Sequence, residues 1–174
     1  MITSIEPEAG SWLLLVGPRS LNAAMLAAIA RLGERGDLRV LDGGNRFNAY
    51  PVARAAQGRP EILNRITVSR AFTCYQVLSL LESTPAIRTP LVILDMLNTF
   101  YDESVNRGER KRILRACITH LKRLQRSAGG VISVHPPAVP SPAAQELLEL
   151  LQAAAADTYF IQPAVSTIEQ MRLF

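Results

Sequence analysis

Apolar and polar residues follow two alternating patterns along this chain. Short apolar runs recur between longer segments in which apolar residues repeat every three or four positions. The runs predict strands over residues 12–16, 39–42, 66–69, 91–95, 131–135 and 158–162. The helical spacing predicts helices at about 20–33, 48–57, 73–83, 107–127 and 142–155. Because the strand runs are apolar throughout, we expect a mostly parallel sheet with helices on both faces, which is an α/β fold class.

Composition predicts a single domain over residues 1–174. Of these residues, 48% are hydrophobic, and the net charge is only +4, which excludes intrinsic disorder. No apolar run approaches the roughly 20 residues needed to span a bilayer, and the first twelve residues carry acids where a secretory signal would be basic. The two cysteines have no metal-ligand spacing. We therefore expect a cytoplasmic protein with no membrane contact and no bound metal.

The positive charge is concentrated in one predicted helix. Residues 107–126 carry eight basic residues against Glu109 alone, whereas the rest of the chain is neutral or acidic. Its apolar residues, from Ile113 to Leu124, recur at helical spacing and predict one buried stripe. Such a helix is either a solvated surface or a contact for a polyanion.

Polar residues gather where the predicted strands end. Ligands of open parallel sheets bind beyond these carboxyl ends. Asp42 and Asp95 are each suited to a turn or to a ligand. Gly43 and Gly44 predict a tight turn with positive φ, and the alternative is that their backbone N–H groups form an anion-binding nest. We assign a vestigial nucleotide- or phosphate-binding site to Gly17, Arg19, Ser20 (also a candidate N-cap), Asp42, Asn45, Asp95 and His135.

The order of these segments resembles the RecA-like ATPase core, and within it the RadA and recombinase-paralogue branch. The resemblance spans about residues 12–162 and is carried by LLLVG before a helix, VLDGGNRF, SRAFTCYQVLSLLE and LVILDMLNTFYDE. It implies a three-layer RecA-like sandwich, with Asp95 in the place of a Walker B carboxylate.

The nucleotide motifs of that family are missing. Counting from Gly17, the second glycine, the lysine and the hydroxyl of a phosphate loop become Asn22, Ala23 and Ala24. The chain's two lysines are Lys111 and Lys122, far from this loop, and the catalytic glutamate falls at about Gly44. Without these groups a phosphoryl transition state is not stabilised. We expect no catalytic residues, no cofactor and no useful ATP hydrolysis.

The resemblance also implies a DNA contact, because the family's loop after the Walker B strand faces single-stranded DNA. That loop corresponds here to residues 102–108 and leads into the basic helix. The expected phosphate contacts are Arg107, Arg110, Lys111, Arg115, Lys122 and Arg126. The second DNA loop of the family corresponds to PPAVPSPAA, which has no charge.

The leading hypothesis is a non-hydrolysing RecA-like binding or assembly module, acting as an accessory in DNA recombination or repair. Its partners would be single-stranded DNA or an acidic protein, and a RecA-like paralogue or a second copy. The alternatives are a nucleotide- or phosphate-binding protein, including a weak ATPase, that uses the strand ends, and a purely protein-binding scaffold.

Overall fold

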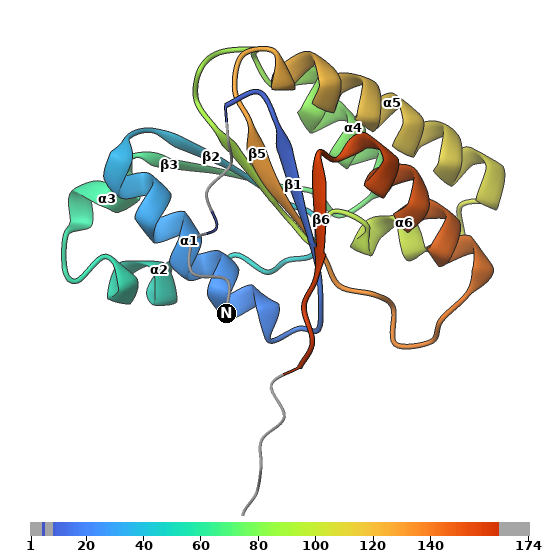
Figure 1. Cartoon of the computed structure of the whole chain (residues 1–174), viewed down its shortest axis with the longest axis horizontal. Helices are drawn as coiled ribbons and strands as arrows, with labels where there is room; N and C mark the ends of the chain where they lie inside the picture. The colour runs from blue at the N-terminus through green and yellow to red at the C-terminus, as the bar shows by residue number, and fades with distance from the viewer. Residues whose placement is uncertain (1–4, 6–8, 164–174) are drawn as a thin grey trace, which may run out of the picture.

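The computed structural model describes residue 5 and residues 9–163, which form one six-stranded sheet with helices on both faces (Figure 1). The strand order is β3-β2-β4-β5-β1-β6, and every pairing is parallel. The strands are β1 (Trp12–Val16), β2 (Leu38–Asp42), β3 (Ile66–Arg70), β4 (Leu91–Leu94), β5 (Gly130–Val134) and β6 (Asp157–Phe160). The α/β fold class is confirmed, and its three layers are consistent with a RecA-like sandwich.

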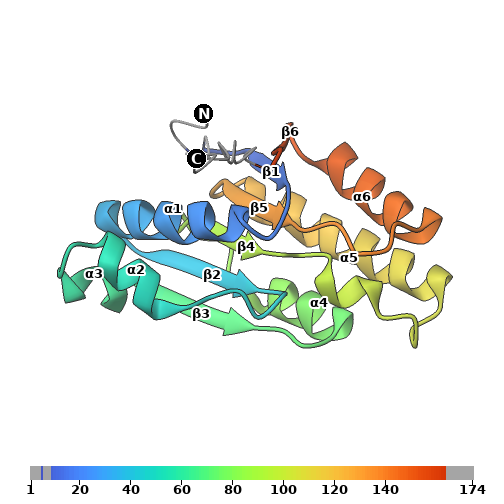
Figure 2. The same cartoon turned by 90° about the horizontal axis from the view of Figure 1, so that it is seen from below.

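Two helical layers enclose this sheet. The helices are α1 (Leu21–Arg35), α2 (Ala49–Ala55), α3 (Pro60–Asn64), α4 (Cys74–Ser83), α5 (Arg107–Gln125) and α6 (Pro142–Ala154), with a 3₁₀ turn, η1, at Asn98–Tyr101. Figures 1 and 2 show α1, α2 and α3 on one side and α4, α5 and α6 on the other. All predicted strands and helices are present. The sequence pattern missed α3 and η1, because four or five residues are too few to show a helical period.

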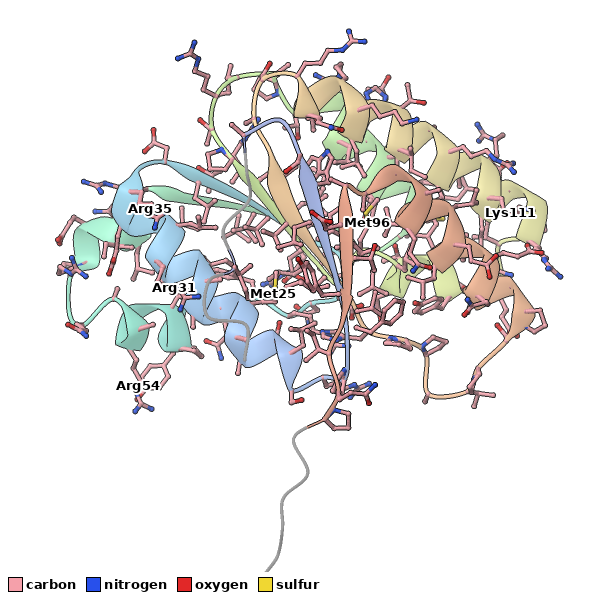
Figure 3. The ribbon with its side chains drawn as sticks, viewed as in Figure 1. Met25, Arg31, Arg35, Arg54, Met96 and Lys111 are labelled. Atoms are coloured by element: carbon pink, nitrogen blue, oxygen red, sulfur yellow. The ribbon has the colours of Figure 1, made fainter. Side chains whose placement is uncertain are left out.

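Each face of the sheet has its own apolar core, because successive side chains of a strand point to opposite faces. Leu14 of β1 packs with α4, α5 and α6, whereas its neighbour Leu15 packs with α1 and α2. Figure 3 labels one methionine of each core, Met96 in the first and Met25 in the second.

Burial on both faces holds for the four inner strands only. β4 and β5 are buried at every residue, whereas most residues of β3 and β6 are exposed. These two strands lie at the sheet edges, where the helices do not cover them completely. Within the described residues, no helix is long and apolar enough to cross a membrane.

Trp12 ties the sheet to α5. Its side chain is 2% exposed, and its indole Nε1 donates a hydrogen bond to the carbonyl oxygen of Leu121 at 2.9 Å. Gly130 lies beside it on β5. A Cβ at Gly130 would lie 2.2 Å from both the Trp12 ring and the carbonyl oxygen of Leu91. The neighbours of Gly130 therefore leave no room for a side chain.

Candidate anion-binding site

The turn from β1 to α1 is too tight to cradle a phosphate in the manner of a phosphate loop. The backbone N–H of Leu21 donates to the carbonyl of Pro18 at 2.9 Å, and that of Asn22 to Arg19 at 3.0 Å. The first N–H groups of the helix are thus already engaged. Ser20 occupies the N-cap position but makes no side-chain capping bond, so the predicted N-cap contact is absent. The turn differs from a phosphate loop in geometry as well as in sequence.

Asp42 organises the loop that follows β2. Its side chain is fully buried and accepts hydrogen bonds from the backbone N–H groups of Gly44, Arg46 and Phe47, at 3.3, 2.8 and 2.9 Å. The same carboxylate accepts a hydrogen bond from Nε of Arg70, at the end of β3, at 3.1 Å. Of the two interpretations of Asp42, the structure supports the turn-forming one.

The two glycines of this loop are required for space and not for positive φ. The residue with positive φ is Asn45, at 55°, so the expectation for Gly43 and Gly44 was wrong. A Cβ on Gly44 would lie 2.5 Å from Oδ2 of Asp95. A glutamate, which the RecA-like proteins that the sequence resembles have at about this position, does not fit while Asp95 keeps its place.

Asp95 joins three loops at the strand ends. It adopts a positive φ of 49° directly after β4 and is 1% exposed. Its Oδ1 accepts a hydrogen bond from the backbone N–H of His135 at 3.1 Å, and its Oδ2 accepts one from Nε of Arg46 at 3.0 Å. Both oxygens therefore have partners, one of them cationic.

His135 is packed between the ends of β1 and β5. It is 5% exposed, and its Nδ1 lies 2.9 Å from the carbonyl oxygen of Gly17. Because a carbonyl only accepts, Nδ1 carries the proton of this hydrogen bond. Nε2 is buried with no hydrogen-bond partner among the described residues. This environment indicates a structural role for the ring.

A cleft of about 840 Å³ opens beside these loops, between the start of α1 and the start of α2. We call it the arginine cleft. It is lined by Arg19, Ser20, Asn22, Ala23, Leu26, Ala27, Asn45, Arg46, Phe47, Asn48, Ala49, Pro51 and Arg70. The lining contains three arginines, one serine and three asparagines, but no aspartate or glutamate.

The arginines of the cleft retain hydrogen-bond donors for a ligand. Arg46 uses Nε on Asp95, and Arg70 uses Nε on Asp42 and Nη2 on the carbonyl of Phe47. Arg19 is exposed, with no ion pair among the described residues. Guanidinium groups bind phosphate and carboxylate through paired N–H donors. The cleft is therefore complementary to an anion.

The structure separates the predicted phosphate-site residues into two groups. Arg19, Ser20 and Asn45 line the cleft, whereas Asp42 and Asp95 lie behind it and hold its arginines. Gly17 and His135 contact each other and are not in the lining. Sequence reasoning missed Arg46, Arg70 and Asn22 as lining residues. Two signals were available in the sequence. Arg70 lies at the end of a predicted strand, and Arg46 follows Asp42 by four residues.

The basic helix α5 retains less free charge than its sequence implies. Arg110 is 8% exposed and donates through Nη1 to the carbonyl of Phe100 at 3.1 Å, so it faces the protein. Arg107 and Lys111 both pair with Glu146 of α6. These hydrogen bonds, from Arg107 first, lower the pKa of Glu146.

Three of the six predicted DNA contacts on α5 remain unpaired. Arg115, Lys122 and Arg126 are exposed and form no ion pair with any described residue. Their spacing of seven and four residues puts them on one helix face, over roughly 16 Å of helix length. The free cations of α5 thus form one short stripe.

No family model and no curated protein matches this sequence. Among the described residues, no group of three or more His, Cys, Asp or Glu side chains is placed to hold a metal ion.

Proposed function

We propose that this chain is a RecA-like binding module that does not hydrolyse ATP and that holds a phosphate-bearing ligand in the arginine cleft. The observation that carries this proposal is the charge of the lining, which has three guanidinium groups and no carboxylate. An anion entering the cleft meets donors without a repelling charge at the surface.

The buried aspartates support binding by fixing two of the arginines in place. Asp42 and Asp95 each accept a hydrogen bond from one guanidinium Nε, at 3.1 and 3.0 Å. Side chains that are held before the ligand arrives lose less conformational entropy on binding. The same arrangement opposes hydrolysis, because Asp95 is engaged and the phosphate-loop lysine and hydroxyl are replaced by Ala23 and Ala24.

Thermal unfolding with pyrophosphate tests this proposal, with Arg19→Ala as the variant. A ligand at one hundred times its dissociation constant stabilises the folded state by about 2.7 kcal/mol, which raises Tm by roughly 5–10 °C in a domain of this size. Arg31→Ala is the matched control, since Arg31 is also exposed on α1 but does not line the cleft (Figure 3).

We expect Arg19→Ala to weaken pyrophosphate binding by about tenfold or more, the usual loss for a hydrogen bond to a charged group. Arg31→Ala should bind like the wild type. An equal loss of pyrophosphate affinity in both variants would mean that only the net charge of the protein matters, and it would contradict a binding site in the cleft. Phosphate release from Mg-ATP should not exceed the buffer blank, and a turnover abolished by Asp95→Asn would refute the non-hydrolysing assignment.

Single-stranded DNA bound along α5 is a second candidate, favoured by the stripe of Arg115, Lys122 and Arg126. Three neutralised phosphates predict a slope of about −2 in log affinity against log salt. Binding should then fall about twentyfold between 50 and 200 mM salt, far less than six contacts would give. In this role the module would serve as a recombination or repair accessory.

Fluorescence anisotropy of a labelled oligonucleotide distinguishes this candidate from the first. A triple variant, Arg115→Ala, Lys122→Ala and Arg126→Ala, should lose DNA binding and keep pyrophosphate binding. The matched triple control substitutes Arg31, Arg54 and Arg59 with alanine. All three are exposed, and they belong to α1, α2 and the start of α3, on the opposite side of the sheet from α5 (Figure 1). If both triple variants bind DNA alike, α5 is not the contact.

A further inference from the structure

The lining of the arginine cleft has no carboxylate that could bind a divalent cation together with a phosphate ligand. The oxygen-bearing side chains of its lining are Ser20 and three asparagines, all neutral. Magnesium in proteins is usually held by one or two carboxylates together with the phosphates of the substrate. The carboxylates that pair with the arginines of the cleft, Asp42 and Asp95, are buried behind the lining.

Those two carboxylates are already engaged, each with a guanidinium and with backbone N–H groups. Each oxygen of Asp42 and each oxygen of Asp95 already accepts at least one hydrogen bond. A metal ion at Asp42 would have to displace one of its four hydrogen-bond donors, and one at Asp95 would lie beside the guanidinium of Arg46. The remaining charges at the cleft surface are positive and repel a cation.

The walls of the cleft fit an apolar ring next to the charged end. Ala23, Leu26 and Ala27 recur at helical spacing on α1 and supply one apolar side. Phe47 and Pro51 supply apolar and aromatic surface from the loop and α2. Small-molecule sites commonly combine such apolar walls with a few oriented polar groups.

We propose that the arginine cleft selects a phosphomonoester that carries an apolar ring and no bound metal ion, the chemistry of a nucleoside monophosphate. This inference rests on the proposed function and specifies its ligand. A triphosphate chelates magnesium through neighbouring phosphates and would bring the cation with it. A phosphomonoester is mainly dianionic at pH 7.5, with a second pKa near 6. Arg19 offers it an unpaired positive charge, and Arg46 and Arg70 offer the guanidinium N–H groups that their aspartates do not use.

Titration calorimetry with AMP and with ATP, each in EDTA and in excess magnesium, tests this selection. We expect AMP affinity to change by no more than about twofold between the two buffers, because no bound metal contributes. ATP should bind about fivefold or more weakly in magnesium than in EDTA, because the chelated cation meets the arginines. Arg19→Ala should weaken AMP binding in both buffers, whereas Arg31→Ala should not.

The outcomes separate this inference from the proposal on which it rests. Binding of ATP that strengthens in magnesium would overturn metal-free selection while leaving a phosphate site in place. The absence of any binding by AMP, ATP and pyrophosphate in both buffers would overturn the phosphate site itself. If inorganic phosphate binds as tightly as AMP, the apolar ring does not contribute to recognition, and that part of the proposal is overturned.

A phosphomonoester occurs both in free nucleotides and at the 5′ end of an oligonucleotide. A trinucleotide with a 5′ phosphate, compared with the same trinucleotide ending in a hydroxyl, distinguishes the two sources. If AMP and the phosphorylated trinucleotide bind with equal affinity, the site also accepts the 5′ ends of oligonucleotides. If AMP alone binds, the site is specific for free nucleotides.

Discussion

Substituting Asp42 with asparagine should destabilise the loop that shapes the arginine cleft. One oxygen of Asp42 accepts from the N–H groups of Gly44 and Arg46, and the other from the N–H of Phe47 and Nε of Arg70. Asparagine retains one of these acceptors. Its amide NH₂ group takes the place of the other oxygen. Where that oxygen is Oδ2, this new donor faces the N–H of Phe47 and Nε of Arg70, which are donors themselves.

The size of this effect follows from the burial of each group. The N–H of Phe47 loses its acceptor in a partly buried position, which costs about 1–3 kcal/mol. The side chain of Arg70 is 37% exposed, so water replaces most of its lost contact. We expect a total loss of about 2–3 kcal/mol, a large part of the roughly 5–15 kcal/mol of a typical domain.

Urea unfolding followed by the emission of Trp12, the only tryptophan, measures this loss. With a slope of about 2 kcal/mol per molar urea, the midpoint should fall by about 1–1.5 M. Asp37→Asn is the matched control, because Asp37 is exposed and should change stability by no more than about 0.5 kcal/mol. Equal midpoints for the two variants would refute the role of Asp42 as the organiser of the loop.

Other predictions concern packing, thiol reactivity and pH. Gly130→Ala should destabilise the protein by several kcal/mol in urea unfolding. Gly108→Ala at the start of α5, where a Cβ would make only an ordinary contact of 3.5 Å with Oδ1 of Asn106, should stabilise it by about 0.5–1 kcal/mol. Similar effects of the two substitutions would contradict the packing around Gly130. Burial raises the pKa of Cys117 to about 12 and also raises that of Cys74, so neither thiol should react with a chromogenic disulfide at pH 8 until the protein is unfolded. A folded protein that reacts at the unfolded rate would contradict their burial. Because the pKa of Glu146 is lowered in the folded protein, its contribution to stability is present above the unfolded pKa and is lost as pH falls through the folded pKa. Glu146→Gln should therefore reduce the fall of Tm at acidic pH. An unchanged dependence of Tm on pH would contradict the ion pair.

The fold could be predicted from the sequence because its signals are local. The inner strands are short apolar runs, and β1 spans the predicted residues 12–16. The helix α5 begins at the predicted residue 107, where the side chain of Asn106 caps it by accepting from the N–H of Glu109. Such patterns depend on residues close together in the chain.

The candidate site was harder to predict because its contacts are distant in the sequence. Arg46 and Asp95 are 49 residues apart, and Arg70 and Asp42 are 28 apart. No periodicity indicates that these residues meet. The charge of α5 was misleading for the same reason, because Glu146, the partner of Arg107 and Lys111, belongs to another helix.

The two buried aspartates each hold one arginine of the cleft. A buried carboxylate that is paired with a guanidinium has its charge balanced, and a metal ion there would meet a neighbouring cation. At Asp95 the carboxylate oxygens are bound to the N–H of His135 and to Arg46. Gly44 packs against the same carboxylate so closely that a side chain there would displace it. The glycine, the arginine and the aspartate are therefore mutually dependent, and replacing Gly44 with glutamate should break the pair between Asp95 and Arg46. On the proposed function, a single substitution should therefore not produce ATP hydrolysis, since the charge at the strand ends would have to change at several positions together.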